Sequence, residues 1–283
     1  MSVKLIALDI DGTLLNGNQE IPEANRAAIA EASSRGVEIA LVTGRRYDFA
    51  MLVADKLGSP LTMIASNGAV IRSTDGQTHV RQLLPADTAK KVLQNTRQWK
   101  DGTAVIFDRP GTQQILLEAF DPEDTRRYWY YTRNKEYISL IPSLETCLTG
   151  NPLQILFSGE VKPMREVEGV LRQLPFANEY AIAATVYEDK DFTMIDVVHP
   201  DVSKGTALTR WASQRGIEKG EIMAIGDNHN DMEMLSLVGT PVVMANGVPE
   251  LKTFGWHQTL SNDEAGVAAA IEHFVLGKTP SCA

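Results

Sequence analysis

Two aspartates, Asp9 and Asp11, end an apolar stretch near the start of the chain and are followed at once by Gly12. Side chains alternate along a strand with period two, so both carboxylates would project to the same side if the strand continued through Asp11. An Asp-Gly turn explains Asp11 but leaves Asp9 unexplained. Because a carboxylate at the end of a buried strand is costly unless a cation or metal pairs with it, the pair indicates a functional site.

Further polar side chains follow other predicted strands or open the helices after them. They are Thr43, Lys204, Asp227, Asn230 and Asp231. Taken singly they have structural explanations, such as a helix-entry threonine, a solvated lysine and an acid in a first helical turn. In open α/β sheets, however, ligands bind beyond the carboxyl ends of the strands. Taken together, these residues predict one polar rim at that edge of the sheet.

The chemistry of the predicted rim suits a hard divalent cation. Carboxylate oxygens at this density are typical of Mg²⁺ sites, in which the ion also binds substrate phosphate oxygens and keeps several waters. Zinc is disfavoured because no cysteine or histidine pair has ligand spacing. His229 lies closest to these residues, and we interpret it as a loop spacer.

The elements that must position these residues alternate between strand and helix at both ends of the chain. Continuous apolar runs separated by short connections predict buried parallel strands with right-handed helical crossovers. The predicted strands are 3–10, 37–44, 62–68, 221–227 and 241–247, and the predicted helices are 22–36, 45–58, 203–216, 230–239 and 265–277. The fold class is therefore α/β, with a doubly wound, Rossmann-like parallel sheet.

The middle of the chain has a different texture. Residues 69–82 read as a hairpin around Asp75-Gly76, and short strand candidates follow at 103–109, 113–120, 153–159, 181–187 and 192–198. We therefore expect an inserted α+β domain over residues 83–194, with residues 1–82 and 195–283 forming the core. The consecutive aromatics Tyr128, Trp129, Tyr130 and Tyr131 cannot share one face at helical spacing, so most should serve packing.

Bulk properties exclude several function classes. A net charge of −9 argues against a nucleic-acid binder, which needs a basic face. No stretch approaches the roughly 20 apolar residues of a membrane helix. Cys147 and Cys282 are too far apart in the sequence, and the latter too terminal, to favour a disulfide. We expect a cytoplasmic monomer or homodimer.

The motifs DIDGT, TGR, SKG and GDNHND occur in that order and together resemble the four motifs of the haloacid dehalogenase-like (HAD) phosphohydrolase superfamily. The ordered set spans both halves of the predicted core. The insertion between TGR and SKG resembles a type IIB cap. These features place the chain closest to the Cof-type phosphatases, so the resemblance implies a HAD core with a cap that determines substrate specificity.

The resemblance also implies roles for the rim residues. Asp9 would be the nucleophile that forms an aspartyl-phosphate, and Asp11 the acid that protonates the leaving oxygen and later activates water. Mg²⁺ would be held by Asp9, the backbone carbonyl of Asp11 and Asp227, with Asp231 holding a water. The implied phosphate- and substrate-binding residues are Thr43, Gly44, Lys204 and Asn230, with Arg45 and Asn67 near the cap opening.

Two neighbours of these motifs are expected to play no part in the chemistry. We expect Arg46 to be a surface residue. Ile10, between the two aspartates, should point to the opposite face of the sheet and act only in packing.

The implied activity is hydrolysis of a small phosphorylated metabolite. The resemblance suggests a sugar phosphate, and a nucleotide, a pyridoxal phosphate-like ring or another phosphate-bearing cofactor fits equally. A phosphomutase using the same intermediate is an alternative. A non-hydrolytic phosphoacceptor like the response-regulator receivers is disfavoured, because receivers are about half this length and lack a cap. A silent binding module is disfavoured because Asp9 and Asp11 are both present.

Overall fold

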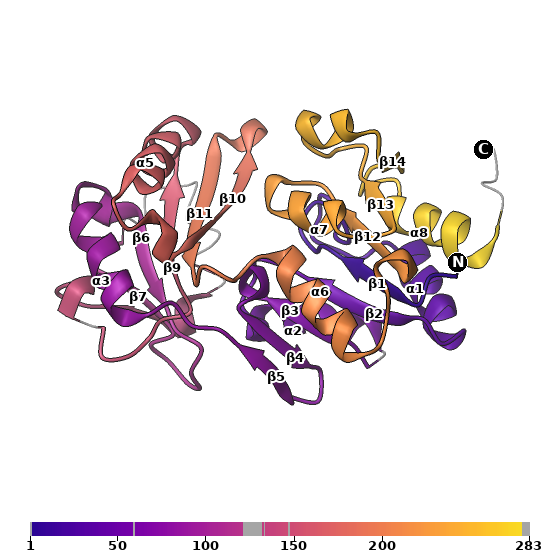
Figure 1. The fold of residues 1–283 in the computed structure, drawn as a ribbon, viewed down its shortest axis with the longest axis horizontal. Helices are drawn as coiled ribbons and strands as arrows, with labels where there is room; N and C mark the ends of the chain where they lie inside the picture. Colours follow the sequence, from indigo (N-terminus) through magenta and orange to yellow (C-terminus); the bar gives the residue numbers. More distant parts are fainter. Residues whose placement is uncertain (1, 59, 121–131, 133, 147, 279–283) are drawn as a thin grey trace. The chain divides into compact units, whose positions relative to one another are not determined.

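The computed structural model describes residues 2–58, 60–120, 132, 134–146 and 148–278. Cys147, Cys282 and the aromatic run from Tyr128 to Tyr131 lie outside the described residues. The chain divides into two units, Met1–Arg81 with Ser203–Ala283, and Gln82–Val202. The first unit therefore joins the two ends of the sequence, and the second is inserted between them (Figure 1).

The described residues of the first unit form an eight-stranded sheet in the order β14-β13-β12-β1-β2-β3-β4-β5. The strands from β14 to β3 are parallel, and β4 and β5 extend the sheet as an antiparallel hairpin. Their bounds are β1 Leu5–Leu8, β2 Glu38–Val42, β3 Thr62–Ala65, β4 Val70–Ser73, β5 Thr78–Arg81, β12 Ile222–Gly226, β13 Thr240–Val243 and β14 His257–Gln258.

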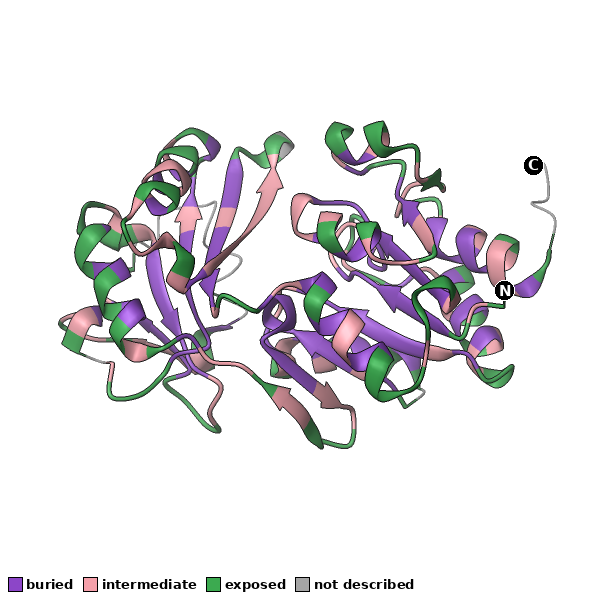
Figure 2. Cartoon of the chain, viewed as in Figure 1, coloured by how far each residue is buried: buried purple, intermediate pink, exposed green. Residues whose placement is uncertain are grey.

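Helices cover both faces of this sheet because its strands are apolar on both sides. Ile6 and Leu8 of β1 pack in one core cluster with residues of α1, α2 and α8, whereas Leu5 and Ala7 pack in another with residues of α6 and α7. The helices are α1 Glu23–Ser34, α2 Tyr47–Ala54, α6 Lys204–Gln214, α7 Met232–Ser236 and α8 Gly266–Ile271. The predicted doubly wound α/β fold is confirmed, and Figure 2 shows the central strands as largely buried.

The end of β1 differs from the sequence-based prediction. The strand stops at Leu8 rather than continuing to residue 10, and the backbone N–H groups of Leu14 and Leu15 both bond to the carbonyl oxygen of Ile10. Asp11 therefore lies in a turn, and the period-two argument for a shared side was wrong. Ile10 is fully buried in the core, as predicted.

The second unit is an α+β layer of its own. Its described residues form a six-stranded sheet in the order β10-β11-β9-β6-β7-β8. The strands are β6 Thr103–Ile106, β7 Ile115–Leu117, β8 Ile138–Leu140, β9 Gln154–Gly159, β10 Ala181–Tyr187 and β11 Phe192–Val198. The α-helices with bounds inside the described part of this unit are α3 Ala86–Asn95 and α5 Val161–Gln173. Residues from both helices pack in one core cluster with Val105, Ile155, Phe157 and Ile195 of the sheet.

The border expected after residue 194 falls inside β11, which pairs with β10 and β9 on either side. The unit instead continues to Val202. The strand expected over 113–120 spans only Ile115–Leu117, and β8 was not predicted. No helix within the described ranges combines the length and apolar character that crossing a bilayer would need.

Candidate active site

The site is built at the carboxyl ends of β1 and β12. These strands are parallel and in register, with Leu8 opposite Ile225. The backbone N–H of Asp9 donates to the carbonyl oxygen of Ile225 at 3.1 Å, so Asp9 begins where β1 ends. Asp227 follows the last residue of β12. Two aspartates distant in sequence are thus placed side by side by strand pairing alone.

Lys204 joins two of the predicted carboxylates. It is the first residue of α6, whose N-terminus is capped by Ser203 in a capping box with Thr206. The Lys204 ammonium lies 2.5 Å from Oδ1 of Asp9 and 2.6 Å from Oδ1 of Asp231. Burial alone would lower the Lys204 pKa, but the two carboxylates outweigh it and raise the pKa.

Asp9, Asp227 and Asp231 form a buried acidic cluster. Each offers a ligand oxygen, and these oxygens lie within 4.8 Å of one another. Burial raises the pKa of the Asp9 carboxyl to about 7, although Lys204 opposes this rise. Burial, followed by the charge of Asp9, also raises the pKa of Asp227 well above its usual range. The cluster therefore gathers more negative charge than a single lysine can neutralise.

The acidic cluster fits a Mg²⁺ ion. Mg²⁺ favours carboxylate oxygens as ligands, and its two positive charges would neutralise the negative charge that Lys204 alone leaves in the cluster. Gly12 has a φ of +82°, and a Cβ placed there would lie 2.3 Å from Oδ2 of Asp227. Only glycine leaves room for that carboxylate beside the turn after β1. Oδ1 of Asp227 accepts the hydroxyl hydrogen of Thr13 at 2.8 Å, which fixes its orientation.

Asp231 holds the loop that follows β12. Its Oδ2 accepts the backbone N–H groups of Asp227 and Asn228, both at 3.0 Å, while its Oδ1 accepts from Lys204. Both oxygens of Asp231 thus organise neighbouring site residues. A contact to a metal-bound water would use the remaining lone pair of Oδ1, because Oδ2 already accepts two hydrogen bonds.

The predicted phosphate-binding residues Thr43, Gly44, Asn67 and Asn230 are neighbours. Thr43 follows β2 and accepts the N–H of Arg45 at its hydroxyl, 3.1 Å away. The N–H of Asn67 donates to the Thr43 carbonyl at 2.9 Å. A Cβ on Gly44 would lie 3.2 Å from Oδ1 of Asn67, and the same oxygen accepts from Asn230 at 3.2 Å. The ends of β2, β3 and β12 therefore meet at one cluster of polar groups.

Asn67 sits on a constrained turn. It has a φ of +55° and follows Ser66, which has a φ of +50°. Non-glycine residues adopt this left-handed region at a cost, and functional sites often retain such strain. Both side chains are almost fully buried, so the turn holds the Asn67 amide in a fixed direction.

Arg45 is bound to Asp11 in this structure. Its Nε and Nη2 lie 2.7 and 2.6 Å from the two carboxylate oxygens. The sequence prediction placed Arg45 at the substrate and did not foresee this pair. The adjacent Arg46 is 6% exposed, so the expectation that it is a surface residue was wrong.

Sequence reasoning also missed Thr13 and Asn246. The amide of Asn246 donates to the Gly12 carbonyl at 2.8 Å, and its oxygen accepts the N–H of Asn262 at 2.9 Å. Thr13 could have been found, because it belongs to the DIDGT motif. Asn246 follows β13 and therefore lies at the same sheet edge, but this position alone is a weaker indication of a functional residue than membership of a motif.

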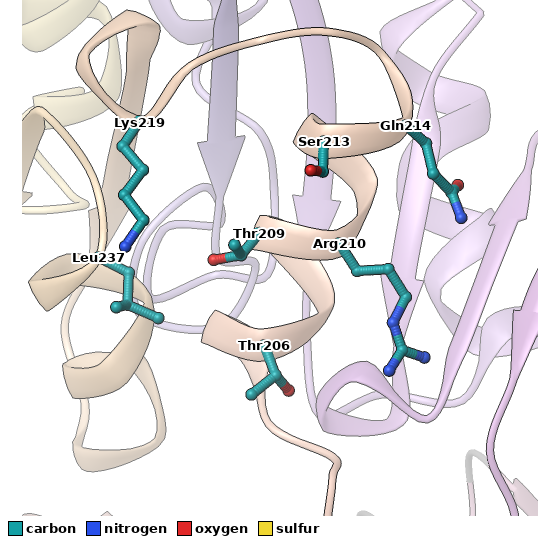
Figure 3. Close-up of a pocket in the computed structure, with 7 residues that line it drawn as sticks. All are labelled: Thr206, Thr209, Arg210, Ser213, Gln214, Lys219 and Leu237. Atoms are coloured by element: carbon teal, nitrogen blue, oxygen red, sulfur yellow. The ribbon is translucent and has the colours of Figure 1, made fainter.

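A separate cavity of about 600 Å³ lies along α6. Its lining residues are Thr206, Thr209, Arg210, Ser213, Gln214, Lys219 and Leu237. Figure 3 shows that α6 supplies five of these side chains, with Lys219 and Leu237 on the other side. None of the predicted site residues lines this cavity, so it is distinct from the acidic cluster.

Comparisons with known proteins support the family that the order of the motifs indicated. Residues 6–271 match the family model described as haloacid dehalogenase-like hydrolase. The 5-amino-6-(5-phospho-D-ribitylamino)uracil phosphatase YwtE of Bacillus subtilis is 30% identical over 98% of this chain and 99% of that protein. The HMP-PP phosphatase of Serratia proteamaculans is 29% identical over 88% of this chain and 86% of its own length.

Solved structures lead to the same family. A haloacid dehalogenase-like hydrolase from B. subtilis superposes with a TM-score of 0.80 and 26% identity, covering 96% of this chain and 100% of that chain. The similarity thus includes both units rather than the core alone. The chain therefore belongs to the haloacid dehalogenase-like hydrolase family and is an enzyme of its phosphatase branch.

Proposed function

We propose that the protein is a Mg²⁺-dependent phosphatase that hydrolyses a small phosphorylated metabolite through an aspartyl-phosphate on Asp9. The observation that carries this proposal is the position of Asp9. One of its oxygens is held by Lys204 at 2.5 Å, in a cluster with Asp227 and Asp231. A buried carboxylate so oriented can present its other oxygen to phosphorus.

The residues that would hold Mg²⁺ are Asp9, Asp227 and the backbone carbonyl of Asp11, with Asp231 acting through a water. When bound, the ion would neutralise charge on the phosphoryl oxygens and on the acidic cluster. The donor set of buried carboxylates and the raised pKa values of Asp9 and Asp227 support this assignment.

The first chemical step transfers the phosphoryl group to the protein. A carboxylate oxygen of Asp9 forms a bond to phosphorus while the bond from phosphorus to the leaving oxygen breaks. Asp11 gives its proton to that oxygen, which departs as an alcohol. Lys204 donates two N–H groups to Asp9 and Asp231 and retains a third for a phosphoryl oxygen.

The second step releases phosphate. Asp11, now a carboxylate, takes a proton from water as the water oxygen attacks phosphorus. The bond between phosphorus and Asp9 breaks and regenerates the carboxylate. The Thr43 hydroxyl accepts from Arg45 N–H, so its hydrogen can donate to a phosphoryl oxygen, and the Asn230 amide can do the same.

For the substrate we propose a small phosphorylated metabolite, with a sugar phosphate as the first class to test. The names of the two relatives support this choice, since one acts on a phosphorylated ribitylamino compound and the other on HMP-PP. We assign substrate selection to the inserted unit, which has its own core and can vary without changing the acidic cluster.

The test is phosphate release from a panel of phosphorylated metabolites, with Mg²⁺ and with EDTA. We expect turnover with Mg²⁺, loss with EDTA, and a fall of several orders of magnitude in Asp9→Asn. Asp55→Asn, which changes an exposed acid after α2, is the matched control and should remain active. Turnover that survives Asp9→Asn would contradict the proposal, and isomerised monophosphate without free phosphate would favour a phosphomutase.

A further inference from the structure

The ion pair between Arg45 and Asp11 is geometrically specific. Arg45 Nε lies 2.7 Å from Oδ2 of Asp11, and Nη2 lies 2.6 Å from Oδ1. Two parallel charge-assisted bonds fix the plane of the carboxylate as well as its position. The Arg45 side chain is 11% exposed and that of Asp11 is 31% exposed, so solvent screens the pair less than an ordinary surface pair.

Arg45 is itself held by two groups. Nη2 also donates to Oε1 of Gln19 at 3.2 Å, and the guanidinium lies 4.7 Å from the centre of the Phe49 ring, within the range of a cation–π contact. Phe49 belongs to α2, which begins two residues after Arg45. The guanidinium is therefore fixed by Gln19 and Phe49 in addition to Asp11.

Gln19 is in turn fixed by a tight loop. It has a φ of +62°, in the left-handed region that glutamine seldom adopts. Asn16 binds this loop, because its side-chain oxygen accepts the N–H groups of Asn18 and Glu20 at 3.0 and 2.9 Å. Backbone strain of this kind persists only where surrounding contacts impose it. The loop keeps the Gln19 amide beside Arg45.

From this geometry we propose that Arg45 is a positioning residue for Asp11, directing its carboxylate toward the leaving-group oxygen, with Gln19 holding Arg45. The inference rests on the proposed function, because it assigns Arg45 a task only if Asp11 transfers a proton. It replaces the sequence-based expectation that Arg45 contacts the substrate.

A positioning role and a substrate-binding role predict different kinetics. An aryl phosphate with a stable phenolate leaving group needs no proton from Asp11, whereas an alkyl phosphate does. If Arg45 acts through Asp11, its loss should slow an alkyl phosphate more than an aryl phosphate. If Arg45 binds the phosphoryl group, the two substrates should be slowed equally, because they share that group.

The experiment measures kcat/KM, which covers the steps up to release of the leaving group, for p-nitrophenyl phosphate and glycerol phosphate. Arg45→Met is expected to lower kcat/KM for glycerol phosphate about tenfold more than kcat/KM for p-nitrophenyl phosphate. This factor is smaller than the roughly 10²–10⁴-fold rate contribution of general acid catalysis, because the Asp11 carboxyl is still present in the variant. Arg45→Lys should behave alike, because lysine keeps the charge but not the two-bond geometry.

Two controls keep the interpretation sharp. In an Asp11→Asn background, Arg45→Met should cause no further leaving-group effect, because the group it positions is gone. Arg72, which similarly lies 4.6 Å from the ring centre of Tyr47 on α2, provides the matched variant Arg72→Met, and this should match wild type. Should Arg45→Met fail to fold by circular dichroism, Gln19→Leu takes its place, with a smaller effect in the same direction.

Equal loss on both substrates, or a loss that persists undiminished without the Asp11 carboxylate, would overturn the positioning role. That outcome leaves the proposed function intact, provided that the wild type hydrolyses both substrates and the Asp9→Asn variant hydrolyses neither of them. A wild type inactive on every phosphate ester would instead overturn the proposed function.

Discussion

Replacing Lys204 with methionine would remove the ammonium group that binds both Asp9 and Asp231. Lys204 is 1% exposed, and it lies 2.5 and 2.6 Å from these carboxylates. Methionine keeps most of the length of the lysine side chain but carries no charge and no hydrogen-bond donor. The variant therefore leaves two buried carboxylates without their shared cation.

The expected loss of stability follows from burial. Breaking a buried ion pair by removing one partner costs about 3–5 kcal/mol, against a typical total of about 5–15 kcal/mol. Lys278 is the matched control, since its ammonium also lies 2.6 Å from one carboxylate, Glu31, and 3.7 Å from a second, Glu272, but it is 46% exposed. Lys278→Met should destabilise the protein far less than Lys204→Met, because solvent screens an exposed ion pair.

The assay is urea unfolding followed by circular dichroism, with EDTA present, at about pH 8 and about pH 5.5. The loss in Lys204→Met should be larger at the higher pH, because the orphaned carboxylates can be protonated at the lower one. A loss below about 1 kcal/mol at both pH values, no greater than in Lys278→Met, would refute the claim that Lys204 offsets buried negative charge.

Further predictions concern the groups around the acidic cluster. Gly12→Ala should abolish Mg²⁺-dependent turnover, since its Cβ would lie 2.3 Å from Oδ2 of Asp227 at a φ of +82°; retained activity and Mg²⁺ affinity, measured by titration calorimetry, would contradict this. Asn246→Ala removes the 2.8 Å bond to the Gly12 carbonyl and should lower kcat with little change in thermal midpoint, whereas unchanged kcat would deny that this bond supports the turn. Without metal, the pKa of Asp9 in the folded state is about 7, against an ordinary 3.8, so the folded state binds more protons between these values. Stability should therefore fall as pH rises through this window, by at most about 4 kcal/mol from Asp9. Urea unfolding in EDTA should show that fall, and a flat profile for wild type would count against it; Asp9→Asn should reduce the fall without removing it, because burial also raises the pKa of Asp227.

Local patterns were sufficient to predict the core. Apolar strands with short helical connections specify a parallel sheet, and a parallel sheet brings the residues after β1 and β12 to one edge. The adjacency of Asp9 and Asp227 follows from this rule, even though 217 residues lie between them in the chain. Lys204 was likewise foreseeable, because it opens a helix that packs on the same sheet.

The partner of Arg45 could not be predicted in the same way. It depends on the turn after β1 and on a left-handed Gln19, and no local pattern marks a glutamine for that conformation. Arg46 was expected at the surface, where most arginines lie. Its burial depends on how the chain enters α2, which is a tertiary property.

The inserted unit was harder to predict because some of its strands are short. Three residues, as in β7 and β8, are too few to show a clear period. The sequence pattern predicted β11 as a strand, but the expected domain border after residue 194 fell inside it. A domain border has no hydrophobic periodicity of its own from which its position could be predicted. The cytoplasmic location and the oligomeric state stay predictions.

The most direct test of the central claim is to identify the residue that takes up phosphorus. Protein mixed with a turned-over substrate and Mg²⁺ is quenched, reduced with borohydride and digested, and the peptides are analysed by mass spectrometry, because borohydride converts an acyl phosphate to an alcohol. The account predicts a reduced side chain at Asp9 that depends on both substrate and Mg²⁺. Reduction at another carboxylate, or turnover with no reducible acyl phosphate on the protein, would contradict it.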